Sequence, residues 1–273
     1  QLVITNNGVA ASLAQAIVGN GITVTNATID CGVNSTGTFT YTGGNLGIPN
    51  GVLLTSGLAS DVANPGTYFS SVQNGNNISD PDVVAISSQA RYDACLLEFD
   101  FIPVCDTLHI TYVFGSEEYP QYIMQYNDVF AMFLSGPDPA GGNYVSHNIA
   151  TLPNGTTPVS IFTVNGGWPI GTGASNPAYY VDNFTNPNTD ICYNGYTVPI
   201  TSVIAVVPCQ TYHMKIVVVD ALNGRYDSGV FIQGNTFTCN VAPAPAIAST
   251  PACINTGTAS VTVTNYTGTP NYL

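Results

Sequence analysis

Basic residues are almost absent from this chain. Only 7% of its 273 residues are charged, against about a quarter in a typical soluble domain. Three bases (Arg91, Lys215 and Arg225) face sixteen acids, which gives a formal charge of −13. Phosphate groups are bound by patches of Lys and Arg, which three bases cannot make, so nucleic acid is a poor partner and anionic membrane surfaces are disfavoured. Divalent cations and neutral glycans remain compatible with this composition.

Closely spaced cysteine pairs and long apolar runs are also absent. None of the seven cysteines lies in a CxxC motif, which argues against a zinc ribbon or a thioredoxin-type site. Widely spaced cysteines in a chain poor in Lys and rich in Asn and Thr predict extracellular disulfides instead. No apolar stretch approaches the roughly 20 residues of a membrane span. The chain begins at Gln1 without a Met or a basic segment, and we interpret it as a mature form after removal of a signal peptide.

Helical patterns are scarce, whereas strand patterns fill most of the chain. The one helix that we predict runs from Gly8 to Gly21, with Asn7 as its cap and with Leu13 and Ile17 on one face. Ten strands are predicted, at 22–29, 36–41, 51–56, 95–102, 107–115, 128–135, 158–164, 197–207, 211–220 and 228–237. Many strands, turns rich in Gly, Pro and Asn, and a single short helix predict an all-β fold, either a β-sandwich or a jelly roll.

One stretch holds two strongly apolar runs with an acidic pair between them. Apolar residues alternate with others over 108–114, the period of a half-buried strand. Every residue of 129–134 is apolar, which predicts a central strand covered on both faces. Glu117 and Glu118, the chain's only adjacent acids, lie between the two runs. We expect the two strands to form a β-hairpin whose connection spans residues 116–127.

Two long segments and the end of the chain interrupt the strand pattern. Residues 57–94 and 165–195 are rich in Gly, Asn, Pro and Ser, and loops of this length are usually functional or disordered. Residues 241–251 alternate Pro and Ala, as a short stiff linker does. We therefore predict one domain over 1–240 and, over 252–273, the first strands of a second, incomplete Ig-like β module.

The six cysteines before the linker allow many connectivities, and one internal echo favours a particular pair. The segments that start at Pro103 and at Val207 both place a cysteine just before a long apolar strand. If those strands are neighbours or face each other, a disulfide between Cys105 and Cys209 is geometrically suitable, because it needs Cα atoms about 4.4–6.8 Å apart. Cys253 is then expected to pair beyond this chain or to stay free.

The acidic residues suggest a calcium site. Ca²⁺ takes about six to eight oxygen ligands, often from carboxylates in irregular loops. Two acidic motifs lie at the ends of predicted central strands, where they can converge. Their candidate ligands are Glu117, Glu118, Asp128, Asp220 and Asp227. Neither motif matches an EF-hand, and the alternative is that these acids cap turns and pair with Arg91 or Arg225.

Catalytic arrangements are less well supported. A glycosidase needs two carboxyl groups across a cleft, about 5–5.5 or 6.5–9.5 Å apart. In an extended strand Glu117 and Glu118 point to opposite faces and do not suit this chemistry, and Glu118 with Asp128 is left open as an alternative pair. Ser116, Ser228 and three histidines are present, but no GxSxG motif accompanies them. We expect no enzymatic activity.

An aromatic loop offers a surface for glycans. Trp168, Tyr179 and Tyr180 lie within residues 166–184, beside Asn and Asp side chains. Sugar binding combines stacking on exposed aromatic faces with directed hydrogen bonds. The alternative is that Trp168 folds back and covers a face of a sheet.

Five motifs together resemble one family. In chain order they are GIPNGVLLTSG (47–57), CLLEFDFIPVCDTLHITYVFGSEEYPQY (95–122), NDVFAMFLSGP (127–137), NIATLPNGTTPVSI (148–161) and TYHMKIVVVDALNGRYDSGVFIQGNTF (211–237). This succession resembles the choice-of-anchor L domain of large secreted surface proteins of gliding and other Bacteroidetes-type bacteria, over residues 1 to about 240. The tail resembles the start of a repeat of gliding-motility adhesins. Relatives often carry a cysteine before the Asn-Asp-Val-Phe motif, where this chain has Ile123 to Tyr126, so disulfide connectivity is not carried over.

The resemblance implies an extracellular protein that is attached to the bacterial cell surface. It also implies export by the type IX secretion system, a C-terminal anchoring signal outside these residues and no established enzymatic activity. We expect a non-enzymatic N-terminal module of a large adhesin, which binds extracellular surfaces or glycans and supports adhesion or gliding motility. Its other expected partners are cell-surface or secretion-system proteins, and calcium is the one cofactor suggested. The alternatives are a carbohydrate-binding module that captures polysaccharide, and a structural cap or docking domain of a surface filament.

Overall fold

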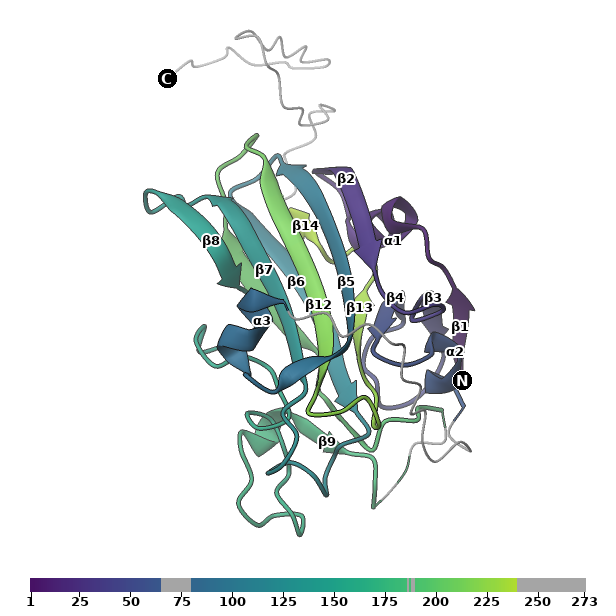
Figure 1. The fold of residues 1–273 in the computed structure, drawn as a ribbon. Coiled ribbons are helices and arrows are strands. Elements are labelled where there is room, and N and C mark those ends of the chain that lie inside the picture. The colour runs from purple at the N-terminus through teal and green to yellow at the C-terminus, as the bar shows by residue number, and fades with distance from the viewer. Residues whose placement is uncertain (65–79, 186, 188–189, 240–273) are drawn as a thin grey trace, which may run out of the picture.

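The computed structural model is a two-layer β-sandwich (Figure 1). It describes residues 1–64, 80–185, 187 and 190–239. Two antiparallel sheets face each other, which confirms the predicted all-β sandwich. The predicted linker at 241–251, the second module at 252–273 and Cys253 lie outside the described residues.

The two sheets have nine and five strands. The first runs β1 (Leu2–Asn6), β3 (Thr36–Tyr41), β4 (Asn50–Thr55), β13 (Ser228–Gln233), β6 (Thr107–Ser116), β10 (Gly195–Thr197) and β9 (Tyr180–Asp182). Two further strands of that sheet also pair with β6: β11 (Ile200–Ala205) and β14 (Thr238–Cys239). The second sheet runs β2 (Ile22–Asp30), β5 (Ala90–Pro103), β12 (Tyr212–Ala221), β7 (Val129–Pro137) and β8 (Asn143–Asn148). Most neighbouring strands are therefore distant in sequence.

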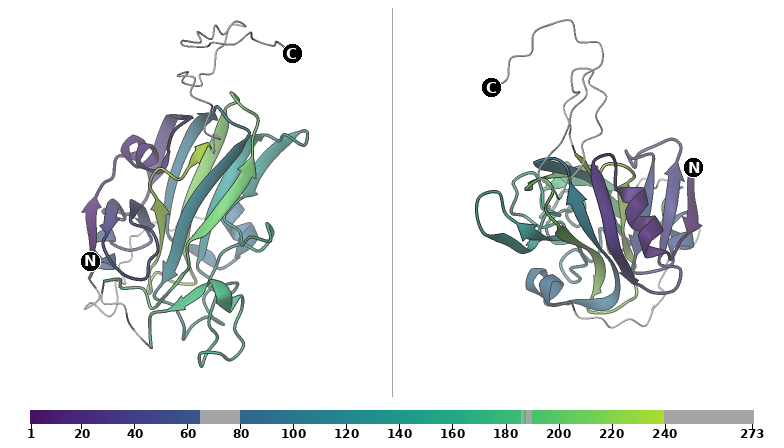
Figure 2. Two further views of the ribbon diagram at one scale, coloured as in Figure 1. Left: turned by 180° about the vertical axis from the view of Figure 1, so that it is seen from behind. Right: turned by 90° about the horizontal axis from the view of Figure 1, so that it is seen from above.

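The main core fills the space between the sheets. Every second residue of the long strands points into it, as the period of a strand requires. These buried side chains include Leu97, Phe99 and Phe101 on β5, Leu108, Ile110, Tyr112 and Phe114 on β6, and Met214, Ile216 and Val218 on β12. Helix α1 (Ala10–Ile17) packs against the side of the sandwich and adds Leu13 and Ile17 to this core (Figure 2).

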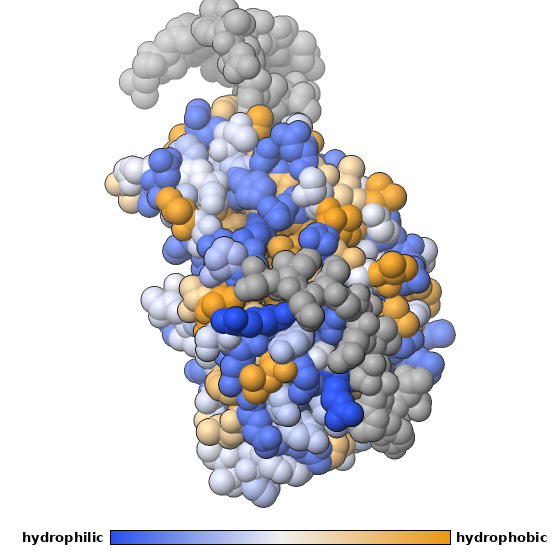
Figure 3. Space-filling model, in the orientation of Figure 1, coloured by the Kyte–Doolittle hydropathy of each residue, from blue (hydrophilic) through white to orange (hydrophobic). Residues whose placement is uncertain are grey.

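Both outer faces of the sandwich are covered as well. Helix α3 (Pro81–Ile86) lies on the five-stranded sheet, where Val83 packs among the outward-facing residues of β7 and β12. Helix α2 (Ala59–Val62) and the segment around Tyr193 cover the nine-stranded sheet. Residues 129–134 are buried on both faces, as predicted. On the face drawn in Figure 3, apolar side chains form small separate groups among polar ones.

β6 and β7 do not form the predicted hairpin. β6 belongs to the nine-stranded sheet and β7 to the five-stranded sheet, so their connection crosses from one layer to the other. Both strands have an apolar inward face, and these faces pack against each other across the core. The ring of Phe130 lies 4.9 Å from that of Tyr112 and 6.4 Å from that of Phe114. Alternation predicts an inward face, but it does not say whether the partner strand lies beside it or across from it.

Local structure differs from the prediction mainly inside the long loops. Helix α1 is confirmed but shorter, and α2, α3 and the 3₁₀ helix η1 (Pro177–Tyr179) are additional to the single helix predicted. Residues 158–164 form a turn with isolated bridges at Pro158 and Ser160, not a strand. The predicted strand at 197–207 is divided, because Pro199 separates β10 from β11.

Two disulfides join the described residues, Cys31–Cys95 and Cys105–Cys239. The predicted pair Cys105–Cys209 is therefore wrong. β14 pairs with the beginning of β6 and sets Cys239 opposite Leu108, which brings the Cα atoms of Cys105 and Cys239 to 5.5 Å. The strands that follow Cys105 and Cys209, β6 and β12, lie in different sheets of the sandwich. The sulfur that pairs with Cys105 comes from β14 instead.

Candidate functional site

One end of the sandwich is closed by a polar layer. At one end of six strands, an acid or a serine lies two residues beyond the last inward-facing apolar residue. It therefore takes the next inward-facing position of the row. These six residues are Ser56 (β4), Asp93 (β5), Ser116 (β6), Asp128 (β7), Asp220 (β12) and Ser228 (β13), and each is at most 4% exposed. They meet because the antiparallel strands place these ends together, at the end of the sandwich opposite Cys239 (Figure 1).

The five predicted calcium ligands lie at this end, and we call them the acidic cluster: Glu117, Glu118, Asp128, Asp220 and Asp227. Hydrogen bonds hold members of the cluster to residues of both sheets. Asp128 accepts from Ala221 N at 2.8 Å and from Ser228 Oγ at 2.6 Å. Asp227 N donates to Glu117 Oε2 at 3.1 Å, and Glu117 N donates to Asp227 O at 3.0 Å. The two acidic motifs thus converge, as the sequence predicted.

Burial dominates the electrostatics of the acidic cluster. Burial, together with the charges of Asp128 and Glu117, raises the pKa of Glu118 to about 9. Burial raises the pKa of Asp128 to about 7, although its hydrogen bonds act in the opposite direction. Burial and the neighbouring charges of Asp128 and Asp227 hold the pKa of Asp220 well above its usual range. Positive charge at this place would therefore be stabilising.

Two carboxylates of the acidic cluster have unsatisfied oxygens. Neither oxygen of Asp220 has a hydrogen-bond partner of ordinary geometry, and a hydrogen bond from Ser56 acts to lower its pKa against the effect of burial. Glu118 Oε2 has no partner either, while its backbone N–H donates to a serine hydroxyl. In the described part of the chain no ion pair joins Glu118 or Asp220 to Arg91 or Arg225, which was the alternative to calcium.

The carboxylates do not form a finished coordination shell. Among the described residues, no three Asp, Glu, His or Cys side chains meet in an arrangement that could hold a metal ion. Asp128 and Glu117 turn oxygens toward hydrogen-bond donors of neighbouring strands. The calcium prediction thus remains a prediction. Sequence reasoning missed Ser56 and Asp93 and considered Ser228 only for catalysis; the signal that could have found them is their inward position at the strand ends.

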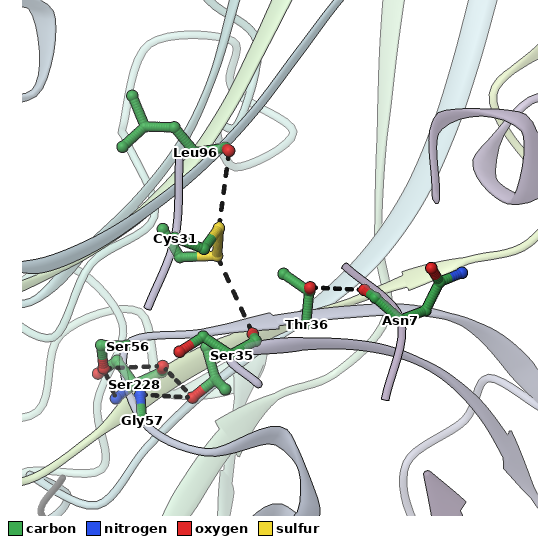
Figure 4. Close-up of a disulfide and its surroundings, with 10 residues drawn as sticks. Asn7, Cys31, Ser35, Thr36, Ser56, Gly57, Leu96 and Ser228 are labelled. Carbon is green, nitrogen blue, oxygen red and sulfur yellow. Dashed lines mark hydrogen bonds between the residues drawn. A yellow bond between two sulfur atoms is a disulfide. The ribbon is translucent and has the colours of Figure 1, made fainter. Parts of the chain in front are cut away.

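The Cys31–Cys95 disulfide adjoins the polar layer. Figure 4 shows this disulfide beside the pair Ser56 and Ser228. Ser228 N donates to Ser56 Oγ at 2.9 Å, and that hydroxyl donates to Ser228 O at 3.2 Å. Ser35 O lies 4.0 Å from Cys95 Sγ. A covalent link thus holds β2 to β5 where the core gives way to polar residues.

The aromatic loop lies at the same end of the sandwich, through β9 and β10. Trp168 is 42% exposed and makes an edge-to-face contact with Phe184, with ring centroids 5.9 Å apart. Tyr180 packs on buried Tyr119 at 5.0 Å, and Tyr179 packs against the main core. Trp168 is therefore available for contact, whereas the two tyrosines are held in the structure.

The residues considered for catalysis have other partners. Ser116 Oγ accepts from Glu118 N, and Ser228 Oγ donates to Asp128. His213 bonds two acids on the outer face of the five-stranded sheet. Surface hollows of about 380 and 350 Å³ lie elsewhere, one lined by 29–34 and the other by 147–153. The pair Glu118 and Asp128 lines neither hollow.

The fold and its polar end define a disulfide-bonded β-sandwich module. The model of the choice-of-anchor L domain family matches residues 3–238, and the chain belongs to that family. No curated protein and no solved structure matches the chain significantly. No helix among the described residues is long and apolar enough to cross a membrane. Family membership and the disulfides indicate a surface-associated module of an extracellular or cell-surface protein.

Proposed function

We propose that this chain is a non-enzymatic contact module of a large cell-surface adhesin and that it supports surface attachment or gliding motility. The observation that carries the proposal is membership of the choice-of-anchor L family over residues 3–238. Export by the type IX secretion system, and contacts with secretion or surface proteins, belong to the same proposal. They rest on the resemblance of the sequence to gliding-motility proteins.

The arrangement of the sandwich supports a contact role for the loops at its polar end. The described chain ends at Cys239, whose strand pairs with the beginning of β6. The aromatic loop lies beyond the other end of β6, about ten strand residues away. A module tethered through its C-terminal side would therefore present the aromatic loop, which leads into β9, away from β14 and the tether (Figure 1).

Glycans are the contacted surface that this loop fits best. An exposed indole offers a face for stacking against a sugar, and the exposed Asn176 supplies a polar group in the same segment, whereas the carboxylate of Asp182 accepts from the loop itself. A carbohydrate-binding module that captures polysaccharide is the second candidate, and the same exposed Trp168 favours it. The remaining candidate, a structural cap or docking domain of a surface filament, would require the β-sandwich but not the exposed indole of Trp168.

A binding experiment separates these roles. The 273-residue chain is applied to a glycan array and to abiotic surfaces, beside Trp168→Ala and the control Val145→Ala. Val145 is 82% exposed on β8, away from the loop. We expect the Trp168 variant to lose at least tenfold in binding and the control to bind normally. Equal binding by all three proteins would show that the contact surface does not include Trp168. The absence of binding by any of them would favour the structural cap.

Cellular tests address location and gliding. Surface proteolysis of intact cells, with and without an active type IX system, should detect the protein outside only when the system is active. Cells that lack the protein should attach or glide less than the parent. Normal attachment and gliding together would contradict the adhesin proposal.

A further inference from the structure

The polar layer at the end of the sandwich is built from oxygen donors. Carboxylates and hydroxyls occupy the inward positions that follow the core on both sheets, and no imidazole or thiol is among these six residues. Buried charges are normally paired with an opposite charge or with a metal ion, because an isolated buried charge is strongly destabilising. The three buried aspartates of this layer, Asp93, Asp128 and Asp220, therefore call for a counter-charge or for protons.

Asp220 is the independent sign that a ligand belongs there. It is 1% exposed, and neither carboxylate oxygen accepts a hydrogen bond of ordinary geometry. It continues the inward row of Ile216 and Val218, so its side chain faces the layer between the sheets. Glu118, also 1% exposed, leaves Oε2 without a partner. Buried polar atoms are nearly always satisfied in folded proteins, so orphaned carboxylate oxygens point to a missing partner.

We propose that the acidic cluster binds one Ca²⁺ ion. The donors are hard oxygens, which suits Ca²⁺ and Mg²⁺, and the irregular loop positions of Glu117, Glu118 and Asp227 suit the flexible geometry of Ca²⁺. Asp220, Glu118 and Asp128 would be the carboxylate ligands, with backbone carbonyls, hydroxyls or water completing the shell. Although the two acidic motifs meet, no three of these described side chains are arranged to hold an ion, so binding would require their side chains to rotate.

The ion would brace both sheets at the loop-bearing end. Asp128 and Asp220 come from the five-stranded sheet, and Glu118 follows the central strand of the nine-stranded sheet. A shared ion would fix the connection between β6 and β7 and the one between β12 and β13. This role is independent of the proposed adhesin function, which does not require calcium.

Calcium titration of the 273-residue chain tests the proposal. After removal of metal with a chelator, isothermal titration with CaCl₂ should show saturable binding of one ion per chain. At about 100 times Kd, the Tm should rise by roughly 5–10 °C. MgCl₂ at the same concentration should raise the Tm much less, since Mg²⁺ demands stricter geometry. No Tm rise and no binding heat at 10 mM CaCl₂ would overturn the proposal, as would an equal rise with MgCl₂.

Variants assign the site. Asp220→Asn should abolish calcium binding and leave the Tm in chelator unchanged or higher, because it removes a buried charge. Glu118→Gln is the second variant, with the same expectation, should the first not fold. The matched control is Asp106→Asn, at an exposed acid beside the opposite end of β6. Binding that survives in both cluster variants, or that is lost in the control, would place calcium elsewhere and overturn the assignment.

Discussion

Lys215 fastens helix α3 to the sandwich, and its removal gives a sharp prediction. Its side chain is 12% exposed on the outer face of the five-stranded sheet. Nζ donates to Asp80 Oδ2 and to Asp82 Oδ2, both at 2.6 Å, and lies 5.0 Å from the ring centroid of Phe133. Lys215→Met keeps the apolar stem but leaves two neighbouring carboxylates without their cation. We expect this variant to be clearly destabilised.

The magnitude follows from burial. Removing one partner of a buried ion pair costs about 3–5 kcal/mol, because the remaining charge is left uncompensated. Asp80 is 9% exposed but Asp82 is 30% exposed, and water stabilises the second carboxylate in part. We therefore expect the free energy of unfolding to fall by about 2–4 kcal/mol. For a domain of this size the Tm should fall by roughly 5–15 °C.

Urea denaturation measures the loss, and a companion variant isolates its cause. Lys215→Met combined with Asp80→Asn and Asp82→Asn should recover most of the stability. Asparagine at position 80 can still accept from the N–H groups of Asp82 and Val83, as Asp80 Oδ1 does at the start of α3. If the triple variant is no more stable than Lys215→Met, the loss comes from packing and not from uncompensated charge.

The contribution of this ion pair should depend on pH. Burial alone would raise the pKa of Asp82, but hydrogen bonds from Lys215 and Ser146 outweigh it, and the pKa is lowered. A lowered pKa gives stability that is present above the ordinary value of about 3.9 and is lost as the pH falls through the lowered value. The stability difference between the protein and Lys215→Met should therefore narrow as the pH falls below the ordinary value of about 3.9. A difference below about 0.5 kcal/mol at pH 7, or one that does not narrow at all as the pH falls below about 3.9, would refute the reasoning.

Two further predictions concern the disulfides and the acidic cluster. Replacing both Cys105 and Cys239 by Ala should lower the free energy of unfolding by about 3–5 kcal/mol in guanidinium denaturation, because their link closes a longer loop (separation 134) than Cys31–Cys95 (separation 64). A smaller loss than for the Cys31–Cys95 double variant would contradict the loop argument. In chelator, thermal stability should fall as the pH rises from about 4 to about 9, because raised pKa values let the folded state hold protons on Glu118 and Asp128 that the unfolded chain releases. Scanning calorimetry across this range checks the sign, and a rise in stability with pH would contradict it.

The strands were predictable where burial repeats along the chain. β6 alternates cleanly and points Ile110 and Phe114 into the core. β7 is apolar throughout because helix α3 covers its outer face, so its continuous pattern correctly predicted burial on both sides. Within residues 214–219 of β12 the one polar side chain is that of Lys215, whose charge is paired with Asp80 and Asp82 at the start of α3. The apolar periodicity of a strand thus predicts which of its faces are buried, but not which element packs against each face.

Pairing between distant segments could not be predicted in the same way. The two apolar runs of the β6–β7 stretch fit a hairpin and a crossing between layers equally well, because both arrangements bury the same faces. The position of Cys239 beside Cys105 depends on β14, a strand of two residues with no periodicity to detect. Short or polar strands such as β1 and β8 were not predicted for the same reason. The errors therefore concern which elements meet, and not which side chains are buried.

The acidic cluster combines both kinds of information. Asp128 lies two residues before Phe130, and Asp220 lies two residues after Val218, so strand periodicity alone directs both carboxylates inward. What the sequence does not give is that six strand ends coincide, which turns scattered acids into one buried layer. A chain with so few bases has little means of neutralising that layer from within, and its described lysine is engaged on the opposite face of the five-stranded sheet. Protons or a bound cation must then balance these carboxylates. The two differ in their response to chelator, because a proton-balanced layer is indifferent to it and a calcium-balanced layer is not.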